Sequence, residues 1–314
     1  MLNTMGTPKA LVTGGAGFIG SHLVENLINE GYELMVIDNL LSGKKENIQN
    51  IITENIHYGD IGSDEILDKV VSFNPDVCFH LAAQASVVIS VEDPMLDFEH
   101  NILQPLKLIK TLLDTGCKKF VFSSSGGTIF GEPEVIPTSE TDFAGEPESP
   151  YGVAKKRLNE FIELLLSDTE MSYSILNFSN VYGPRQDPNG EAGVISIFTS
   201  KMINNSEPTV FGDGEQTRDY IYVQDVVDAL ILSSKIETDL FLNIGTGIET
   251  SVNQLVATLK KTIGYEGNII YEPKRDGELL RSVLNNSKAR KLLKWEPKFT
   301  LDKGIFELIK WLKG

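Results

Sequence analysis

The amino-acid sequence predicts an α/β protein in which a doubly wound parallel sheet carries a smaller mixed α/β lobe. Over the first 180 residues, short apolar runs alternate with amphipathic stretches, and a glycine-rich turn follows the first apolar run. After Asn180 the chain becomes rich in Gly, Pro and Asn turns. Regular strand–helix alternation implies parallel strands with helices on both faces.

The elements follow from the hydrophobic pattern. Buried strands are predicted at Ala10–Val12, Leu34–Ile37, Val77–Leu81, Phe120–Phe122 and Tyr173–Phe178. Helices are predicted at Phe18–Glu30, Asp64–Val71, Asn101–Thr115, Pro150–Asp168 and Ile305–Lys313. Residues 1–179 are assigned to the large sheet and 180–314 to the smaller lobe, with strands at Tyr220–Val223 and Leu240–Ile244 that return to the sheet.

The composition limits the partners. Among 314 residues, 28 Lys and Arg face 44 Asp and Glu, for a formal net charge of −16. So acidic a surface disfavours nucleic acid or an anionic membrane as the main partner. Cys78 and Cys117 lie in apolar contexts without metal-ligand spacing, so we expect core thiols in a reducing cytoplasm and no metal site. We also expect neither a signal peptide nor a membrane span.

The first strand runs directly into TGGAGFIG, residues 13–20, and then into a helix. Gly14 permits the tight turn, Gly17 lets the backbone approach a pyrophosphate, and Gly20 allows close contact between helix and strand. The helix N-terminus then faces the phosphates. This strand–turn–helix context indicates a Rossmann dinucleotide site.

Two carboxylates follow later strands. Asp38 ends the second strand, eighteen residues beyond Gly20, where it can accept both ribose hydroxyls of an adenosine and repel a 2′-phosphate. We therefore predict NAD rather than NADP as the cofactor. The alternative is that Asp38 is only a turn residue at the end of the strand. Asp60 can hydrogen-bond the adenine amine or simply serve as a turn acid.

Tyr151 and Lys155 are four residues apart at the start of a predicted helix, which places them on one face. A phenol titrates near ~10, so it acts as a base at neutral pH only when its anion is stabilised, here by an ammonium. The same spacing is common on helix surfaces. Downstream of a dinucleotide site, it predicts a catalytic pair. The preceding strand ends in Ser123-Ser124-Ser125-Gly126-Gly127-Thr128, where a hydroxyl can bridge substrate and tyrosine, unless the loop serves only for turning.

These motifs resemble the extended short-chain dehydrogenase/reductase family, among its nucleotide-sugar epimerases and dehydratases. The resemblance covers nearly the whole chain. It includes TGGAGFIG, the run from Asp38 to Asn47, HLAAQASV from His80, SPYGVAK from Ser149, NVYGPRQDPNGEAGV from Asn180, FGDGEQTRDYIYVQDVV from Phe211, NIGTG from Asn243 and RDGE from Arg275.

The resemblance implies two sets of contacts. The NAD set is Gly14, Gly17, Phe18, Ile19, Gly20, Asp38, Asn39, Ser42, Gly43, Asp60, Ile61, Leu81, Ala82, Ala83, Asn101, Ser123, Ser124, Tyr151, Lys155, Phe178 and Ser179. The substrate set is Ser86, Ser125, Gly126, Asn180, Arg185, Gly193, Val194, Thr209, Val210, Phe211, Arg218, Arg275, Glu278 and Ser282. Arg218 and Arg275 would bind the diphosphate, and Glu278 the uridine ribose.

Three positions depart from, or vary within, the family pattern. Many relatives carry the catalytic Ser or Thr five residues before the glycine matching Gly131, where this chain has Gly126, so the role passes to Ser125, with Ser124 and Thr128 as substitutes. Phe130 replaces a usual Tyr. Ser282, seven residues after Arg275, is small where a bulky residue restricts relatives to unmodified hexoses, so an N-acetyl group at C2 is expected to fit.

The resemblance is strongest to members that epimerise UDP-glucose at C4. It implies NAD-dependent interconversion of UDP-glucose and UDP-galactose through a 4-keto sugar, with Tyr151 as base, Ser125 positioning the hydroxyl and Lys155 holding Tyr151 as phenolate. The alternatives are a dTDP- or UDP-sugar 4,6-dehydratase, a uronate-type epimerase or decarboxylase, and a non-catalytic NAD-sensing protein. A homodimer formed through Asn101–Thr115 and Pro150–Asp168 is also implied.

Overall fold

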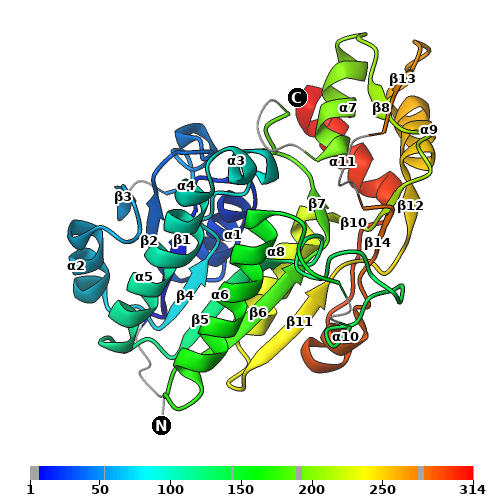
Figure 1. Cartoon of the computed structure of the whole chain (residues 1–314). Coiled ribbons are helices and arrows are strands. Elements are labelled where there is room, and N and C mark those ends of the chain that lie inside the picture. Colours follow the sequence, from blue (N-terminus) through cyan, green and yellow to red (C-terminus); the bar gives the residue numbers. More distant parts are fainter. Residues whose placement is uncertain (1–6, 53, 143–144, 189–192, 275–278, 314) are drawn as a thin grey trace. The chain divides into compact units, whose positions relative to one another are not determined.

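The computed structural model describes residues 7–52, 54–142, 145–188, 193–274 and 279–313 (Figure 1). A seven-stranded sheet has the order β11-β6-β5-β4-β1-β2-β3. Its strands are β1 (Lys9–Thr13), β2 (Glu33–Asp38), β3 (Ile56–Tyr58), β4 (Val77–His80), β5 (Lys119–Ser125), β6 (Ser172–Phe178) and β11 (Leu240–Ile244). Strands β3, β2, β1, β4 and β5 pair in parallel. The α/β fold class is therefore confirmed, and the order reverses between β1 and β4, where such sheets bind ligands.

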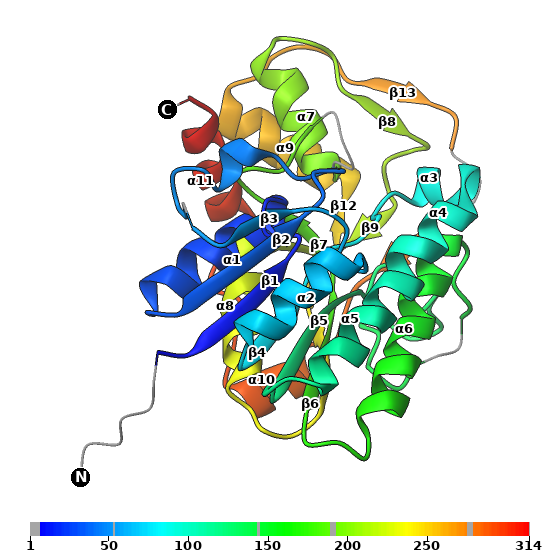
Figure 2. The same ribbon diagram turned by 90° about the vertical axis from the view of Figure 1, so that its left-hand side faces the viewer.

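Helices cover both faces of the sheet (Figures 1 and 2). Alternate residues of β1 and β2, namely Leu11, Met35 and Ile37, belong to one buried core with residues of α2 (Asp64–Phe73), α5 (Gln104–Leu113) and α6 (Pro150–Leu166). Intervening residues such as Val12 and Val36 lie beside α1 (Phe18–Asn29), where Val24 approaches Gly15. Because successive side chains of a strand point to opposite faces, each face of the sheet has its own buried core.

The chain divides into two compact units. The first comprises residues 1–124, 149–176 and 227–241, and the second 125–148, 177–226 and 242–314. The sequence-based boundary after residue 179 differs from this division, which also assigns residues 177–179 to the second unit. The segment that follows β5 belongs to the second unit, and most of α8 (Val223–Ser234) belongs to the first.

The second unit holds three small sheets. They are β7 (Asn180–Tyr182) with β10 (Tyr220–Tyr222), β12 (Thr250–Ser251) with β9 (Thr217–Arg218) and β14 (Arg281–Ser282), and β8 (Thr209–Phe211) with β13 (Ile270–Glu272). Its further helices are α7 (Val194–Ile203), α9 (Val252–Ile263), α10 (Ser287–Leu293) and α11 (Leu301–Lys313). The expected return to the large sheet is correct for Leu240–Ile244. It is wrong for the segment at Tyr220, which pairs with β7 instead.

The helix predicted at Asn101–Thr115 is interrupted. A π-helical turn, η2 (Glu99–Leu103), precedes α5, and the Gln104 amide donates to the Glu99 carbonyl five residues back. Pro105 has no N–H for the carbonyl of Asn101, so the helical ladder shifts here. Two short helices, α3 (Val87–Glu92) and α4 (Pro94–Phe98), come before it, and a 3₁₀ turn, η1 (Lys45–Asn47), follows β2. Within the described ranges, every helix is too short or too polar to cross a lipid bilayer.

Candidate active site

The strand register of the first unit aligns the predicted cofactor residues. Thr13 is level with Ile37 of β2 and with His80 of β4, and His80 is level with Phe122 of β5. The residues that follow these strand ends therefore meet at one edge. This edge carries the glycine turn, Asp38, the loop at Leu81 and the serines at the end of β5.

The glycine turn is closed tightly against its neighbours. Gly14 has a φ of +71°, and a Cβ there would come within 2.7 Å of the Ala82 amide nitrogen. A Cβ on Gly20 would overlap the Gly14 carbonyl oxygen. Helix α1 then starts after Gly17 with no side-chain cap and no acidic residue in its first turn. Its N–H groups and positive dipole end suit a phosphate group.

Asp38 holds this turn through its carboxylate. One oxygen accepts from the Ala16 amide at 2.9 Å and the other from the Leu40 amide at 2.8 Å. Gly43 leaves the carboxylate its space, because a Cβ there would lie 2.6 Å from an Asp38 oxygen. Burial raises the pKa of Asp38, and the backbone N–H donors oppose that rise. Nearby, Asn39 Nδ2 donates to Asp60 at 2.7 Å, which fixes the second predicted carboxylate at the same edge.

Tyr151 and Lys155 lie in the first two turns of α6. Ser149 caps this helix by accepting from the Gly152 amide at 3.1 Å, and Pro150 occupies its first turn. The Lys155 side chain is buried, with Nζ donating to the Ser123 carbonyl at 3.0 Å and lying 4.6 Å from the Phe122 ring centre. Nζ is also 5.9 Å from the centre of the Tyr151 ring. Burial lowers the pKa of Lys155 to about 7, with Asp97 acting against this fall.

The three serines at the end of β5 differ in their surroundings. Ser123 Oγ donates to the His80 carbonyl at 3.2 Å. Ser124 is buried, and its Oγ has no hydrogen-bond partner among the residues the structure describes. Ser125 is half-buried and begins the second unit. The Ser123 hydroxyl is therefore engaged by the backbone of β4, whereas the Ser124 hydroxyl is buried and Ser125 is the more exposed of the two.

The second unit places Arg218 and Ser282 opposite each other on β9 and β14. Arg218 is half-buried and donates to the Thr217 carbonyl at 2.8 Å. On the alternate positions of the same strands, Arg281 binds both carboxylate oxygens of Glu249, at 2.5 and 2.7 Å, and Thr217 Oγ1 donates to Glu249 at 2.6 Å. Hydrogen bonds from Arg281 and Thr217 lower the pKa of Glu249 to about 2.

Other predicted substrate residues also lie in the second unit. Gly193 precedes α7, which has no side-chain cap and no acid in its first turn. The Asn180 amide donates to the Asp219 carbonyl at 2.9 Å, and the expected strand Thr209–Phe211 is β8. Phe178 is buried, and the Ser179 amide donates to the Ile244 carbonyl at 3.0 Å.

Comparison with known proteins gives consistent results. Residues 10–245 match the model of the NAD-dependent epimerase/dehydratase family. The chain belongs to that family. This assignment confirms the resemblance inferred from the sequence motifs.

Solved structures of family members cover nearly the whole chain. A UDP-glucose 4-epimerase of Thermotoga maritima, solved with UDP-glucose, is 45% identical with a TM-score of 0.94, over 97% of this chain and 98% of that one. A UDP-N-acetylglucosamine 4-epimerase of Methanobrevibacter ruminantium, in complex with UDP-N-acetylmuramic acid, is 34% identical with a TM-score of 0.92, over 98% and 99%. A Thermus thermophilus UDP-glucose 4-epimerase complexed with NAD is 37% identical with a TM-score of 0.89, over 98% and 99%.

The residues present in this family member fit NAD. The start of α1 has no side-chain cap, the glycines before it have no space for a Cβ, and the Asp38 carboxylate binds the same turn, as a pyrophosphate and ribose site requires. The buried Ser124 and Ser179 hydroxyls have no partner in the described part of the chain. Among the described residues, no cluster of three or more His, Cys, Asp or Glu is placed to hold a metal ion.

Gln84 and Asp97 are not among the site residues predicted from the sequence. Asp97 is buried and accepts from Gln84 Nε2 at 2.9 Å and from Asn101 Nδ2 at 2.8 Å. Asn101 also bonds the backbone of Gln84, donating to its carbonyl at 2.8 Å and accepting from its amide at 3.1 Å. The Asn101 side chain thus fixes the loop after β4. An acid placed between Leu96 and Phe98, four residues before Asn101, was the available signal.

Some predicted residues cannot be placed. Arg275 and Glu278 lie outside the described residues, as does the segment 189–192 of the motif that begins at Asn180. Ser86 caps α3 by accepting from the Ile89 amide at 3.0 Å. Arg185 is half-buried and has a φ of +69°.

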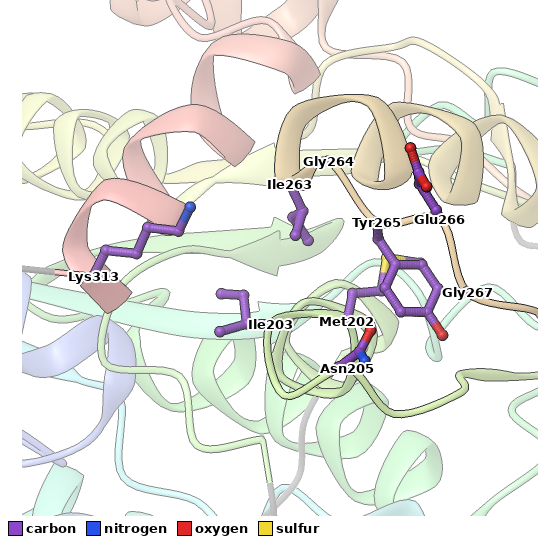
Figure 3. A pocket seen from close by; sticks show the side chains of 9 residues that line it. All are labelled: Met202, Ile203, Asn205, Ile263, Gly264, Tyr265, Glu266, Gly267 and Lys313. Atoms are coloured by element: carbon purple, nitrogen blue, oxygen red, sulfur yellow. The ribbon is translucent and has the colours of Figure 1, made fainter.

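A pocket of about 380 Å³ lies at the ends of α7 and α9 in the second unit (Figure 3). Its lining residues are Met202, Ile203, Asn205, Ile263, Gly264, Tyr265, Glu266, Gly267 and Lys313. None of them is a predicted site residue. The Tyr265 hydroxyl within it donates to the Ser206 carbonyl at 3.1 Å, which ties the two helix ends together.

Proposed function

We propose that this protein is an NAD-dependent 4-epimerase that interconverts UDP-glucose and UDP-galactose. The observation that carries the proposal is the Tyr151–Lys155 pair beside the end of β5, in the unit that also holds the glycine turn. The similarity to UDP-glucose 4-epimerases over nearly the full chain supports the same reaction. When bound, NAD would accept the hydride from C4 of the sugar and return it to the opposite face.

The chain's own residues would move the proton and hold the substrate. Tyr151, as a phenolate, takes the proton from the C4 hydroxyl and gives it back to the C4 oxygen when the hydride returns, and Ser125 positions that hydroxyl. The Lys155 ammonium, held by the Ser123 carbonyl, stabilises the phenolate. Arg218 binds the diphosphate, because a guanidinium matches phosphate oxygens in pairs.

A coupled assay of UDP-galactose turnover tests the proposal. We expect Tyr151→Phe to abolish turnover while the purified variant keeps its NAD. Tyr173→Phe makes the same chemical change at the opposite end of the sheet, near the start of β6, and should leave turnover intact. Full activity of Tyr151→Phe would refute the assignment.

We further propose that UDP-N-acetylhexosamines are substrates. The small side chain of Ser282 lies opposite Arg218, and the similar Methanobrevibacter enzyme is a UDP-N-acetylglucosamine 4-epimerase. The purified enzyme should turn over UDP-GlcNAc as well as UDP-glucose. Turnover of UDP-glucose alone would refute this role of Ser282.

We also propose that the protein is a homodimer in the cytoplasm. Both cysteines are free and buried, which favours a reducing compartment. Helices α3, α4 and α6 contact one another and expose apolar side chains, among them Val88 (66% exposed), Met95 (73%) and Leu164 (71%). We name these exposed residues, with Val91 and Phe161, the α3–α6 surface. An apolar surface of this kind suits a second copy of the chain.

A further inference from the structure

Asp97 is a buried carboxylate whose hydrogen bonds do not require its charge. Only 1% of the residue is exposed, and both donors, Gln84 Nε2 and Asn101 Nδ2, bind the same oxygen, Oδ1. An amide oxygen would accept the same two bonds. Burying a carboxylate is costly unless a cation compensates for it. The charge of Asp97 therefore needs an explanation outside its own cluster.

One candidate cation is the buried Lys155. Helix α4, which carries Asp97, and the π turn η2 both contact α6, which carries Lys155. Lys155 Nζ contacts a carbonyl oxygen and two aromatic rings, none of which bears a full negative charge. Such partners compensate only part of the cost of burying an ammonium.

The charged and titratable groups around Lys155 come from several helices and one strand. Tyr151 shares its helix, His80 lies on β4, His100 lies on η2 and Asp97 lies on α4. Burial lowers the pKa of His80 to about 3, so this imidazole is neutral at working pH. Burial lowers the pKa of Lys155, and Asp97 opposes that fall. Burial likewise raises the pKa of Asp97, and this rise is opposed by hydrogen bonds from Gln84 and Asn101 and by the charges of Lys155 and His100. Among the described residues, Asp97 is thus the anion that acts on Lys155.

We propose that Asp97 is a positioning residue for catalysis, which Gln84 and Asn101 hold beside α6 and whose charge keeps the Lys155 side chain protonated. Asp97 acts through Lys155 and needs no contact with substrate. The inference rests on the proposed roles of Tyr151 and Lys155, because a neutral lysine no longer stabilises a phenolate. The cluster also couples the loop after β4 to this lysine, through the backbone of Gln84.

The pH dependence of kcat for UDP-galactose tests the inference in the NAD-loaded enzyme. Asp97→Asn keeps the Oδ1 acceptor and removes the charge. The alkaline limb of its kcat profile should move towards acid by about one pH unit or more, since an opposite charge nearby shifts a pKa by about that amount. The ratio of the wild-type kcat to the variant kcat should therefore grow with pH and reach about tenfold at pH values above the alkaline limb. Asp97→Glu should restore the limb, even if kcat falls.

Asp93→Asn is the matched control. It removes the same charge from an exposed residue four positions earlier, and Asn can still cap α4 at the Leu96 amide. Its limb should stay at the wild-type position. A folded, NAD-loaded Asp97→Asn enzyme whose limb does not move would overturn the inference, whatever its kcat.

Two further variants separate the possible failures. If Asp97→Asn does not fold, Asp97→Ser replaces it. Should neither neutral variant fold while Asp97→Glu does, the charge serves stability and the inference fails. Lys155→Met is expected to be inactive. Retained activity of that variant would refute the role of Lys155, and a wild-type enzyme that does not turn over UDP-galactose would refute the proposed function itself. Inactivity of Lys155→Met together with an unmoved Asp97→Asn limb would refute only the role of Asp97.

Discussion

Among single residues, Gly126 matters because no side chain, and hence no hydroxyl, fits at its position. A Cβ at this position would lie 2.5 Å from Leu284 Cδ1 and 3.2 Å from the Phe178 carbonyl oxygen. No side chain fits there without moving Leu284. We therefore expect the catalytic hydroxyl at a neighbouring position, and Ser125 is half-buried whereas Ser124 is buried.

Ser125→Ala tests this assignment. If the Ser125 hydroxyl positions the substrate alcohol for proton transfer, its removal should lower kcat by about 10²-fold, the lower end of what a positioned proton-transfer group contributes. Ser124→Ala makes the same change one residue earlier and should cost less. Steady-state kinetics with UDP-galactose measure both. A larger loss for Ser124→Ala would reverse the assignment.

His80 should make folding sensitive to acid. Its ring is fully buried, stacked with Phe120 and Phe122, and Nδ1 is 2.7 Å from Thr13 Oγ1. Burial lowers its pKa from 6.5 to about 3. Between these pH values the unfolded state binds more protons than the folded state. The contribution of His80 to the free energy of unfolding is therefore fully present above pH 6.5 and is lost as pH falls towards 3.

The slope of this loss is about 1.4 kcal/mol per pH unit for one group. His80→Asn keeps an acceptor near Thr13 but cannot be protonated, so its free energy of unfolding should lack this pH-dependent contribution. Urea unfolding at several pH values gives the difference in free energy of unfolding between the two proteins. The wild-type advantage should shrink steadily below pH 6.5. A difference that does not change with pH would contradict the prediction.

For whole elements, the start of α6 matters most because it places Tyr151 and Lys155. Proline has a fixed φ that suits a first helical turn, and the Ser149 hydroxyl satisfies the Gly152 amide. Both signals are visible in the sequence, and the helix begins at Pro150, as the hydrophobic pattern predicts.

Ser149→Ala should lower the free energy of unfolding by about 1 kcal/mol, because the Gly152 amide loses its acceptor. Ser149→Asp should retain most of the stability, since Asp caps equally well. Ser167→Ala, at the other end of the same helix, removes a hydroxyl that only donates to the Leu164 carbonyl, and serves as control. Urea unfolding compares the three. Equal losses at Ser149 and Ser167 would argue against the cap.

Elements with strong local signals could be predicted, and those decided by distant contacts could not. Strand β1, the glycine turn and α1 follow from a short stretch of sequence. The π turn before α5 depends on Pro105, whose missing N–H shifts one hydrogen bond. The partner of β10 is β7, and nothing near Tyr220 specifies that choice. The Gln84–Asp97 contact joins residues thirteen apart on either side of α3, so no periodicity reports it.

Over the whole molecule, the chain passes between the two compact units five times. The order of the segments explains why one boundary in the sequence could not describe the division. The segments 125–148 and 177–226 follow β5 and most of β6 directly, so each leaves the sheet at its carboxyl edge and enters the second unit. The residues at that edge thereby connect the two units along the chain.

Assembly is the property of the whole chain that remains to be tested. If the α3–α6 surface joins two copies, Leu164→Glu places a charge in the interface and loses the burial of a leucine, about 1.5–3 kcal/mol, so dimer affinity should fall at least tenfold. Leu292→Glu makes the same change at an exposed leucine of α10 and should leave the dimer intact. Sedimentation velocity over a range of protein concentrations measures both variants. A wild-type chain that stays monomeric at micromolar concentrations, or a dimer broken by Leu292→Glu and not by Leu164→Glu, would exclude this surface.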